Sequence, residues 1–373
     1  MKKDKLKKQA IAMIDAMALE LQELSLYLHR NPEQGSQEHL ALGRFRELAK
    51  RHGFYWQENI SGYETAFIAR QGTGDIGVAF LAEYDALPGL GHACGHNLIA
   101  AMSWGAAVVF GAVAGDQARS YCIGCPAEET DGAKVAMADD GVFDGLTAAM
   151  IVHPADQNAI GGTAYATHPL QVTFRGTPAH VASKTHRGVN ALDALVLFYQ
   201  GLPVLKRAFT EEAILAAIIT KGGIAPNIIP AEAEAKLTVR AMSAQYLEET
   251  VLPAVSRLAA GVAAATGTTV ETCHYEPLFK ELINDSRLMT LFQTNMELLG
   301  EVMTVLPPDR ADGSTDVGNV SHVVPTIHPD LSIGCNLSAH TPEFAAATGS
   351  EFAQQRLLVG AKAMVMTAID LLL

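Results

Sequence analysis

The order of strand-like and helix-like segments changes near residue 168 and changes back near residue 277. Before the first change, short apolar runs at 66–69, 78–81, 121–125 and 148–152 alternate with helical stretches, among them a long apolar stretch at 97–113. Strands that alternate with helices indicate an open α/β sheet. The same alternation resumes after the second change and ends in a helix at about 352–372.

The segment between the two changes has a different order of elements. Leu170, Val172 and Phe174 alternate with polar residues, which is typical of a half-exposed strand. The pattern then predicts, in order, a helix, two strands, a helix and a strand, at 188–205, 214–220, 232–240, 244–265 and 268–274. This β-α-β-β-α-β order is that of a ferredoxin-like unit. We therefore predict an α/β fold, with a mixed central sheet flanked by helices at 1–167 and 278–373 and an inserted ferredoxin-like α+β domain at 168–277.

The charge and the cysteine content exclude several classes of protein. The chain has 27 basic and 40 acidic residues, a net charge of −13, and binding to nucleic acid or anionic membranes needs clustered basic residues. We also expect no membrane-spanning run of about 18 uncharged apolar residues. The chain has only five cysteines, an odd number, which does not suggest a disulfide framework. The composition therefore predicts a cytoplasmic protein with reduced thiols and no membrane or nucleic-acid partner.

A glycine-rich segment at 89–97 contains three residues that can bind metal, His92, Cys94 and His96. It lies between a predicted strand and the start of the predicted helix at 97–113, where ligands bind in open α/β sheets. A thiolate and an imidazole two residues apart can reach one metal ion or a close pair of ions. The alternative interpretation is a glycine-rich loop that holds a buried cysteine and polar histidines.

Two adjacent carboxylates, Glu128 and Glu129, follow the apolar run at 121–125. One of them can ligate a metal while the other acts as a general base on the water that the metal activates. The alternative is a solvated acidic turn or a helix N-terminus, where acidic side chains are also favoured.

Two single histidines complete the pattern, His153 directly after the run at 148–152 and His340 near the end of the chain. A lone histidine is more often structural than a ligand. However, the carboxyl ends of neighbouring parallel strands meet at one edge of a sheet. We therefore expect four side chains that follow such strands to converge: Cys94, His96, Glu129 and His153. Nitrogen, sulfur and oxygen ligands of this kind suit zinc, manganese or a similar divalent ion.

Together, these runs resemble the amidohydrolase branch of the aminoacylase/carboxypeptidase-like metallopeptidases, peptidase family M20. The resemblance rests on the runs at 91–96, 126–129 and 152–154, on 176–180, 188–191 and 222–230 within the inserted segment, and on 28–33 and 314–321 outside it. It spans nearly the whole chain, with the motifs in order. One departure is Asn97, where many relatives have aspartate; this points to the branch with aminobenzoyl-glutamate and dipeptide hydrolases.

The resemblance implies a site with two divalent metal ions, zinc or manganese, and five ligands: Cys94, His96, Glu129, His153 and His340. It makes Glu128 the general base, which takes a proton from the activated water and passes it to the leaving nitrogen. It also implies that the inserted domain is a lid that pairs subunits. His180 of that lid would reach the neighbouring active site and stabilise the oxyanion. Asn227 and Arg240 would hold the substrate, and Arg240 would bind the substrate's carboxylate.

The expected protein is thus a homodimeric, metal-dependent amidohydrolase. Its small-molecule substrate would be an N-acyl amino acid, an aminobenzoyl-glutamate-like compound or a small dipeptide. A non-catalytic binding or regulatory subunit on the same scaffold is the alternative, against which the retention of Glu128 and a full ligand set argues. A thiol enzyme that uses Cys94 is a third possibility.

Overall fold

The computed structural model describes residues 2–372, and these fall into two compact units. The first unit comprises the chain up to Thr163, Leu282–Arg310 and the chain from Asp316 onward. The second comprises Ala164–Glu281 and the short segment Ala311–Thr315. The boundaries expected from the sequence, 168 and 277, lie four residues inside the second unit at each end (164 to 168, and 277 to 281). The boundaries 168 and 277 of the inserted domain remain a prediction.

The first unit is built on a six-stranded mixed sheet of order β1-β2-β4-β3-β5-β14. Its strands are β1 (Tyr55–Ile60), β2 (Tyr63–Gln71), β3 (Ile76–Ala82), β4 (Ala118–Gly124), β5 (Ala148–Met150) and β14 (Thr326–Ile327). Strands β4, β3, β5 and β14 are mutually parallel, whereas β1 and β2 are antiparallel to their neighbours. The predicted mixed central sheet is confirmed: its four parallel strands extend to the β14 edge, and the antiparallel strands β1 and β2 form the other side.

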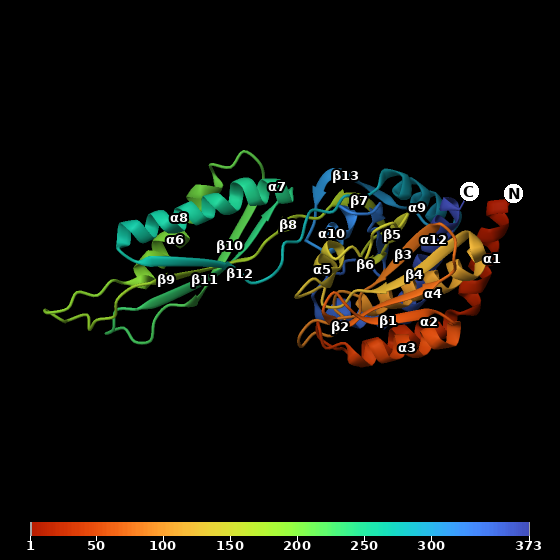
Figure 1. The fold of residues 1–373 in the computed structure, drawn as a ribbon, viewed down its shortest axis with the longest axis horizontal. Coiled ribbons are helices and arrows are strands. Elements are labelled where there is room, and N and C mark those ends of the chain that lie inside the picture. The colour runs from red at the N-terminus through yellow and green to blue at the C-terminus, as the bar shows by residue number, and fades with distance from the viewer. Residues whose placement is uncertain (1, 373) are drawn as a thin grey trace. The chain divides into compact units, whose positions relative to one another are not determined.

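Helices surround this sheet (Figure 1). They are α1 (Lys2–Ala16), α2 (Ala18–Arg30), α3 (His39–His52), α4 (His96–Ala114), α5 (Ala133–Asp139), α9 (Ser286–Leu298), α10 (Val317–Ser321), α11 (Pro342–Thr348) and α12 (Glu351–Leu371). A short 3₁₀ turn, Gly115–Gln117, follows α4. Helix α4 packs on β3 and β4 and also contacts α1, α2 and α12, so it occupies the centre of the core.

Burial explains the unusual composition of α4. This helix contains an 18-residue window that is long and apolar enough to cross a membrane, so the expectation that no such run exists was wrong. In the structure 83% of that window is buried inside the protein. At Gly105 a Cβ atom would lie 2.7 Å from Leu21 Cδ1, so α4 and α2 pack closely at this point. A helix that is apolar all round is a core helix when neighbours cover every face.

A second, four-stranded sheet of the first unit was not predicted. Its order is β13-β7-β15-β6, with β6 (His153–Ala155), β7 (Ala159–Thr163), β13 (Thr304–Ala311) and β15 (Asp330–Ser332). Three of its strands, β6, β7 and β15, are short, and the four strands come from distant parts of the chain, so no local alternation of polar and apolar residues revealed the sheet. This sheet matters for the site because β6 begins at His153.

The second unit has the predicted ferredoxin-like arrangement. Strands β9 (Leu170–Arg175), β10 (Ala213–Lys221), β11 (Glu232–Ala241) and β12 (Thr269–His274) form an antiparallel sheet of order β10-β11-β9-β12, with β8 (Ala166–Thr167) paired to β11. Helices α6 (Ala191–Lys206) and α8 (Leu252–Thr266) lie along one face of the sheet (Figure 1). A short α7 (Ala244–Tyr246) and a π-helical turn, Leu247–Val251, lead into α8. The two helices and the sheet enclose the unit's core of apolar side chains.

Candidate active site

The side chains that follow the parallel strands of the first unit converge, as the topology predicts. Glu83 and Asp85 come directly after β3, Glu128 and Glu129 come shortly after β4, and His153 follows β5. Because these strands are parallel neighbours, their carboxyl ends lie on the same edge of the sheet. The edge therefore gathers carboxylates and an imidazole from segments about 70 residues apart (83 to 153).

Gly95 brings the predicted metal loop against the start of β6. It has φ +86° and lies immediately before α4, which starts at His96. A Cβ atom at this position would lie 2.7 Å from Pro154 Cγ, so only glycine permits both the left-handed backbone and the close approach. As a result Cys94 Sγ lies 3.3 Å from His153 Nε2.

All five predicted metal ligands lie together, and we call them the ligand cluster: Cys94, His96, Glu129, His153 and His340. Candidate ligand atoms lie within 4.8 Å of one another in three overlapping sets: Cys94, His96 and His153; Cys94, Glu129 and His340; and His96, Glu128 and Glu129. Cys94, His96 and Glu129 each belong to two of the sets. The predicted base, Glu128, lies within the same group of side chains.

Hydrogen bonds fix which ring nitrogen each histidine presents. His96 Nδ1 lies 2.9 Å from the backbone oxygen of Asp85 and 3.0 Å from its Oδ1, so Nδ1 is the donor. His153 Nδ1 likewise lies 2.8 Å from the Pro154 carbonyl oxygen. Both rings therefore turn Nε2 toward the cluster. Asp85 also accepts the Glu129 backbone N–H at 3.0 Å, so one buried carboxylate orients two members of the ligand cluster.

Unpartnered atoms within the cluster fit a bound cation. Among the described residues, His96 Nε2 and Glu129 Oε1 are buried and make no hydrogen bond. Their close neighbours are themselves ligand-type atoms, Glu83 Oε2 at 3.5 Å from His96 Nε2 and His340 Nε2 at 3.2 Å from Glu129 Oε1. Buried polar atoms are normally paired, and a site for an ion is a common reason when they are not. Thiolate, imidazole and carboxylate donors at this spacing match the preferences of zinc and related divalent ions.

The surroundings change the proton affinities of the cluster. Burial alone would lower the pKa of His96, but the adjacent Asp85 carboxylate raises it well above the ordinary value, which makes Nε2 a strongly basic ligand. Burial lowers the pKa of His153 to about 3, so that ring stays neutral. Burial, together with the charges of Glu83 and Glu129, raises the pKa of Glu128 well above the ordinary value. A carboxyl group with a raised pKa suits general acid–base work near neutral pH.

Sequence reasoning missed a buried lysine beside the cluster. Lys134 of α5 is fully buried, and its Nζ lies 2.7 Å from Glu83 Oε1 and 2.5 Å from Asp316 Oδ1. Glu83, Glu128 and Asp316 also form a set of close carboxylates, but the ammonium group already supplies a cation there. We therefore assign these acidic side chains to Lys134 rather than to a metal ion. The signal in the sequence was a lysine within the apolar run 133–138.

The predicted lid residues all lie in the second unit, but not together. Val181 N donates to Asn227 O at 3.1 Å, so His180 and Asn227 come from adjoining segments. Arg240 lies near the end of β11, opposite Thr167, whereas the start of β11 at Glu232 pairs with Arg175. Eight residues of strand separate Glu232 from Arg240, which corresponds to roughly 26 Å. Within one chain, Arg240 therefore lies far from His180 and Asn227.

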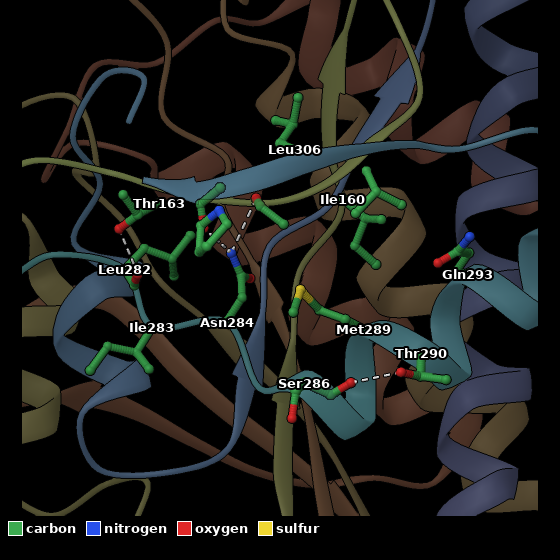
Figure 2. Close-up of a pocket in the computed structure, with 14 residues that line it drawn as sticks. Ile160, Thr163, Leu282, Ile283, Asn284, Ser286, Met289, Thr290, Gln293 and Leu306 are labelled. Atoms are coloured by element: carbon green, nitrogen blue, oxygen red, sulfur yellow. Dashed lines mark hydrogen bonds between the residues drawn. The ribbon is translucent and has the colours of Figure 1, made fainter. Parts of the chain in front are cut away.

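A separate cavity of the first unit contains none of the candidate residues. Its volume is about 530 Å³, and β7, α9, β13 and the segment before α9 line it (Figure 2). Among its labelled side chains, Asn284 donates to the carbonyl oxygens of Gly161 and Gly162 at 3.4 and 3.2 Å. No lining residue titrates near neutral pH or offers a typical metal ligand, so the catalytic chemistry belongs to the ligand cluster instead.

Comparison with known proteins agrees with this architecture. Residues 169–261, which lie in the second unit, match the family described as the peptidase dimerisation domain. Over 386 aligned residues the chain is 37% identical to an Xaa-Arg dipeptidase of Mus musculus, covering 98% of this chain and 89% of that protein. It is 30% identical to one of the subunits of the p-aminobenzoyl-glutamate hydrolase of Escherichia coli, covering 92% and 86% of the two chains.

A solved structure shows the same fold. The crystal structure of a dinuclear metal binding peptidase of the M20 family from Bacillus subtilis superposes with a TM-score of 0.74 at 20% identity, over 96% of this chain and 99% of that one. The relatives that share sequence over nearly the full length are hydrolases of amide bonds. The chain therefore belongs to the M20 peptidase family, in its amidohydrolase branch, and is an amide-bond hydrolase.

Proposed function

We propose that this hydrolase is metal-dependent and that its catalytic centre is the ligand cluster with Glu128. The observation that carries the proposal is the convergence of five ligand-type side chains around one carboxyl group with a raised pKa. Cys94, His96, Glu129, His153 and His340 would hold two divalent ions, because their candidate ligand atoms fall into overlapping sets. When bound, such ions polarise the amide carbonyl and lower the pKa of water.

In this proposal Glu128 moves the protons. Its carboxylate takes a proton from the attacking water and then delivers it to the nitrogen of the leaving amine. The raised pKa of Glu128 supports both steps, since a base must also be able to act as an acid near neutral pH. Asp85 keeps His96 and Glu129 in place for this chemistry through its two hydrogen bonds.

For the substrate we propose a small dipeptide with a basic C-terminal residue, because the mouse relative at 37% identity is an Xaa-Arg dipeptidase. An aminobenzoyl-glutamate-like compound is the second candidate, supported by the Escherichia coli relative at 30% identity. A panel of Xaa-Arg, Xaa-Lys and neutral dipeptides, aminobenzoyl-glutamate and N-acyl amino acids would separate them through kcat/KM. Faster turnover of aminobenzoyl-glutamate or of N-acyl amino acids than of the basic dipeptides would contradict our first choice.

We also propose that the enzyme is a homodimer whose active sites use both chains. The family match to a dimerisation domain supports pairing through the second unit. The distance between Arg240 and the pair His180 and Asn227 supports shared sites, because one substrate cannot contact both places in a single chain. Arg240 would then bind the substrate carboxylate in one protomer, while His180 would come from the other.

The role of Glu128 and of the metal can be tested together. Glu128→Gln should lower kcat by roughly 10²- to 10⁴-fold, the usual contribution of a general base, without changing metal content. Chelation should abolish turnover, and added zinc or manganese should restore it. Wild-type kcat in Glu128→Gln would disprove the assigned role. Activity that survives chelation and is lost on thiol alkylation would instead indicate a thiol enzyme.

A further inference from the structure

The turn that carries Glu128 has a strained backbone. Ala127 precedes Glu128 directly and has φ +59°, in the left-handed region that a residue with a Cβ atom rarely adopts. The neighbouring peptides contribute to the turn, because Ala127 O accepts the N–H of Gly132 at 2.7 Å. A strained conformation at a functional site persists only where its surroundings fix it.

A buried carboxylate outside the ligand cluster holds this residue. The N–H of Ala127 donates to Glu38 Oε1 at 2.9 Å. Glu38 is fully buried, and its Oε2 accepts the Thr65 hydroxyl at 2.7 Å. Thr65 is fixed in turn, since the Tyr84 hydroxyl donates to its carbonyl oxygen at 2.6 Å.

Glu38 has no cation to offset its burial. None of the ion pairs among the described residues involves it, in contrast to Glu83 and Asp316, which share Lys134. A buried carboxylate without a cation is costly, so its position calls for a specific reason. The Thr65 hydroxyl and the Ala127 N–H that donate to it are both neutral, and Ala127 is the residue directly before Glu128.

The residues on either side of Glu128 are therefore held in the same way, each through its own backbone N–H. On one side the Ala127 N–H donates to Glu38, and on the other the Glu129 N–H donates to Asp85 Oδ2 at 3.0 Å. Asp85 also binds His96, so its effect is shared with the ligand cluster. Glu38 contacts no member of that cluster by a hydrogen bond, and its contact with the turn is separable from metal binding.

We propose that Glu38 is a positioning residue for catalysis: its carboxylate holds Ala127 in the left-handed conformation that aims Glu128 at the substrate. The inference rests on the proposed role of Glu128 as the base. It adds a residue outside the ligand cluster, Glu38, to those that catalysis requires. Glu38 would act on the rate of the chemical step and not on substrate or metal affinity.

Three variants, assayed at pH 8 with matched metal loading, test this proposal. Glu38→Met removes the acceptor but keeps similar bulk, and kcat should fall on the order of 10- to 100-fold because the base is misplaced. KM and metal content should stay at wild-type values. Glu38→Gln retains an oxygen acceptor for the Ala127 N–H and should retain most of kcat.

The third variant combines Glu38→Met with Ala127→Gly. Glycine adopts a positive φ without steric cost, so the turn no longer needs the acceptor, and kcat should rise roughly threefold or more above that of Glu38→Met. A loss in Glu38→Gln equal to that in Glu38→Met would overturn the proposal. So would a loss that appears in KM or metal content, or a double variant no faster than Glu38→Met.

If Glu38→Met does not fold, Ala127→Val decides the question. It leaves Glu38 in place but puts a β-branched residue at a positive φ, which should lower kcat while metal content is retained. Unchanged kcat would overturn the proposal. Glu128→Gln, assayed in parallel, separates the two ideas: an inactive Glu128→Gln with fully active Glu38→Met refutes only the role of Glu38, whereas an active Glu128→Gln refutes the proposed base itself.

Discussion

At the residue scale, the reactive side chains of this protein are ionisable groups that the fold buries, and burial changes their pKa values. In the ligand cluster, burial keeps the His153 ring neutral, and the Asp85 carboxylate makes His96 more basic. Both effects favour metal binding. Glu38 shows the opposite side, since its charge is buried without a cation. Function at this scale depends on residues whose ionisation the fold has changed.

The buried carboxyl of Glu38 predicts a pH dependence of stability. Burial raises the pKa of Glu38 from 4.5 to about 7, so between those values the folded protein binds more protons than the unfolded chain. The contribution of Glu38 to stability is therefore fully present below pH 4.5 and is lost as pH rises through 7, by about 3 kcal/mol in all. Glu38→Gln lacks this contribution. Urea unfolding at pH 5 and pH 8 should show wild type losing stability relative to Glu38→Gln, and a difference independent of pH would contradict the assignment.

At the scale of elements, one buried ammonium group ties three segments together. Lys134 comes from α5, Glu83 follows β3 and Asp316 directly precedes α10. The Lys134 backbone N–H also donates to Asp316 Oδ2 at 3.0 Å. The carboxylates that border the active site are thus held by a residue 182 positions away from Asp316 in the sequence.

Lys134→Met should therefore be strongly destabilising. It leaves two buried carboxylates without a cation, and removal of one partner from a buried ion pair typically costs about 3–5 kcal/mol. Lys362→Met is the matched control, because Lys362 pairs with an exposed Asp15 at 2.6 Å and such pairs contribute at most about 1 kcal/mol. Urea unfolding of the whole protein measures the decrease in the free energy of unfolding for both variants. Equal effects of the two substitutions would show that the buried triad has no special role.

At the scale of the whole molecule, the exposed surface of the second unit is suited to self-association. Strand β10 forms one edge of its sheet, and Ile218 on it is 65% exposed. Four apolar side chains on α6 are also exposed: Val196, Leu197, Tyr199 and Val204. A long apolar edge strand tends to pair with another chain unless it is covered. This surface therefore supports the proposed homodimer.

Ile218→Lys should convert the dimer to monomers, since a charge at the edge opposes strand pairing. Sedimentation velocity measures the change. Leu19→Lys is the control, because Leu19 is 77% exposed on α2 of the first unit and should leave the dimer intact. If His180 completes the neighbouring site, the monomer should retain metal but lose most of its activity. A wild-type protein that sediments as a monomer would disprove the dimer.

The α/β and ferredoxin-like arrangements could be predicted from the order of residues alone, and so could the convergence of Cys94, His96, Glu129 and His153. His340 was expected as a ligand only through the resemblance to a known family. Strand periodicity is local, and the carboxyl ends of parallel strands must meet at one edge, so both kinds of information are present in the chain. The second sheet of the first unit could not be predicted in this way, because its short strands pair only across long separations.

Two groups that support the cluster, Glu38 and Lys134, became apparent only once the chain was folded. Glu38 reaches Ala127 across 89 residues, and Lys134 reaches Asp316 across 182. No pattern in the chain marks such pairs, because a buried charge becomes meaningful only when its partner and its loss of water are known. The sequence supplied the reactive groups, while the packing set their positions and their proton affinities.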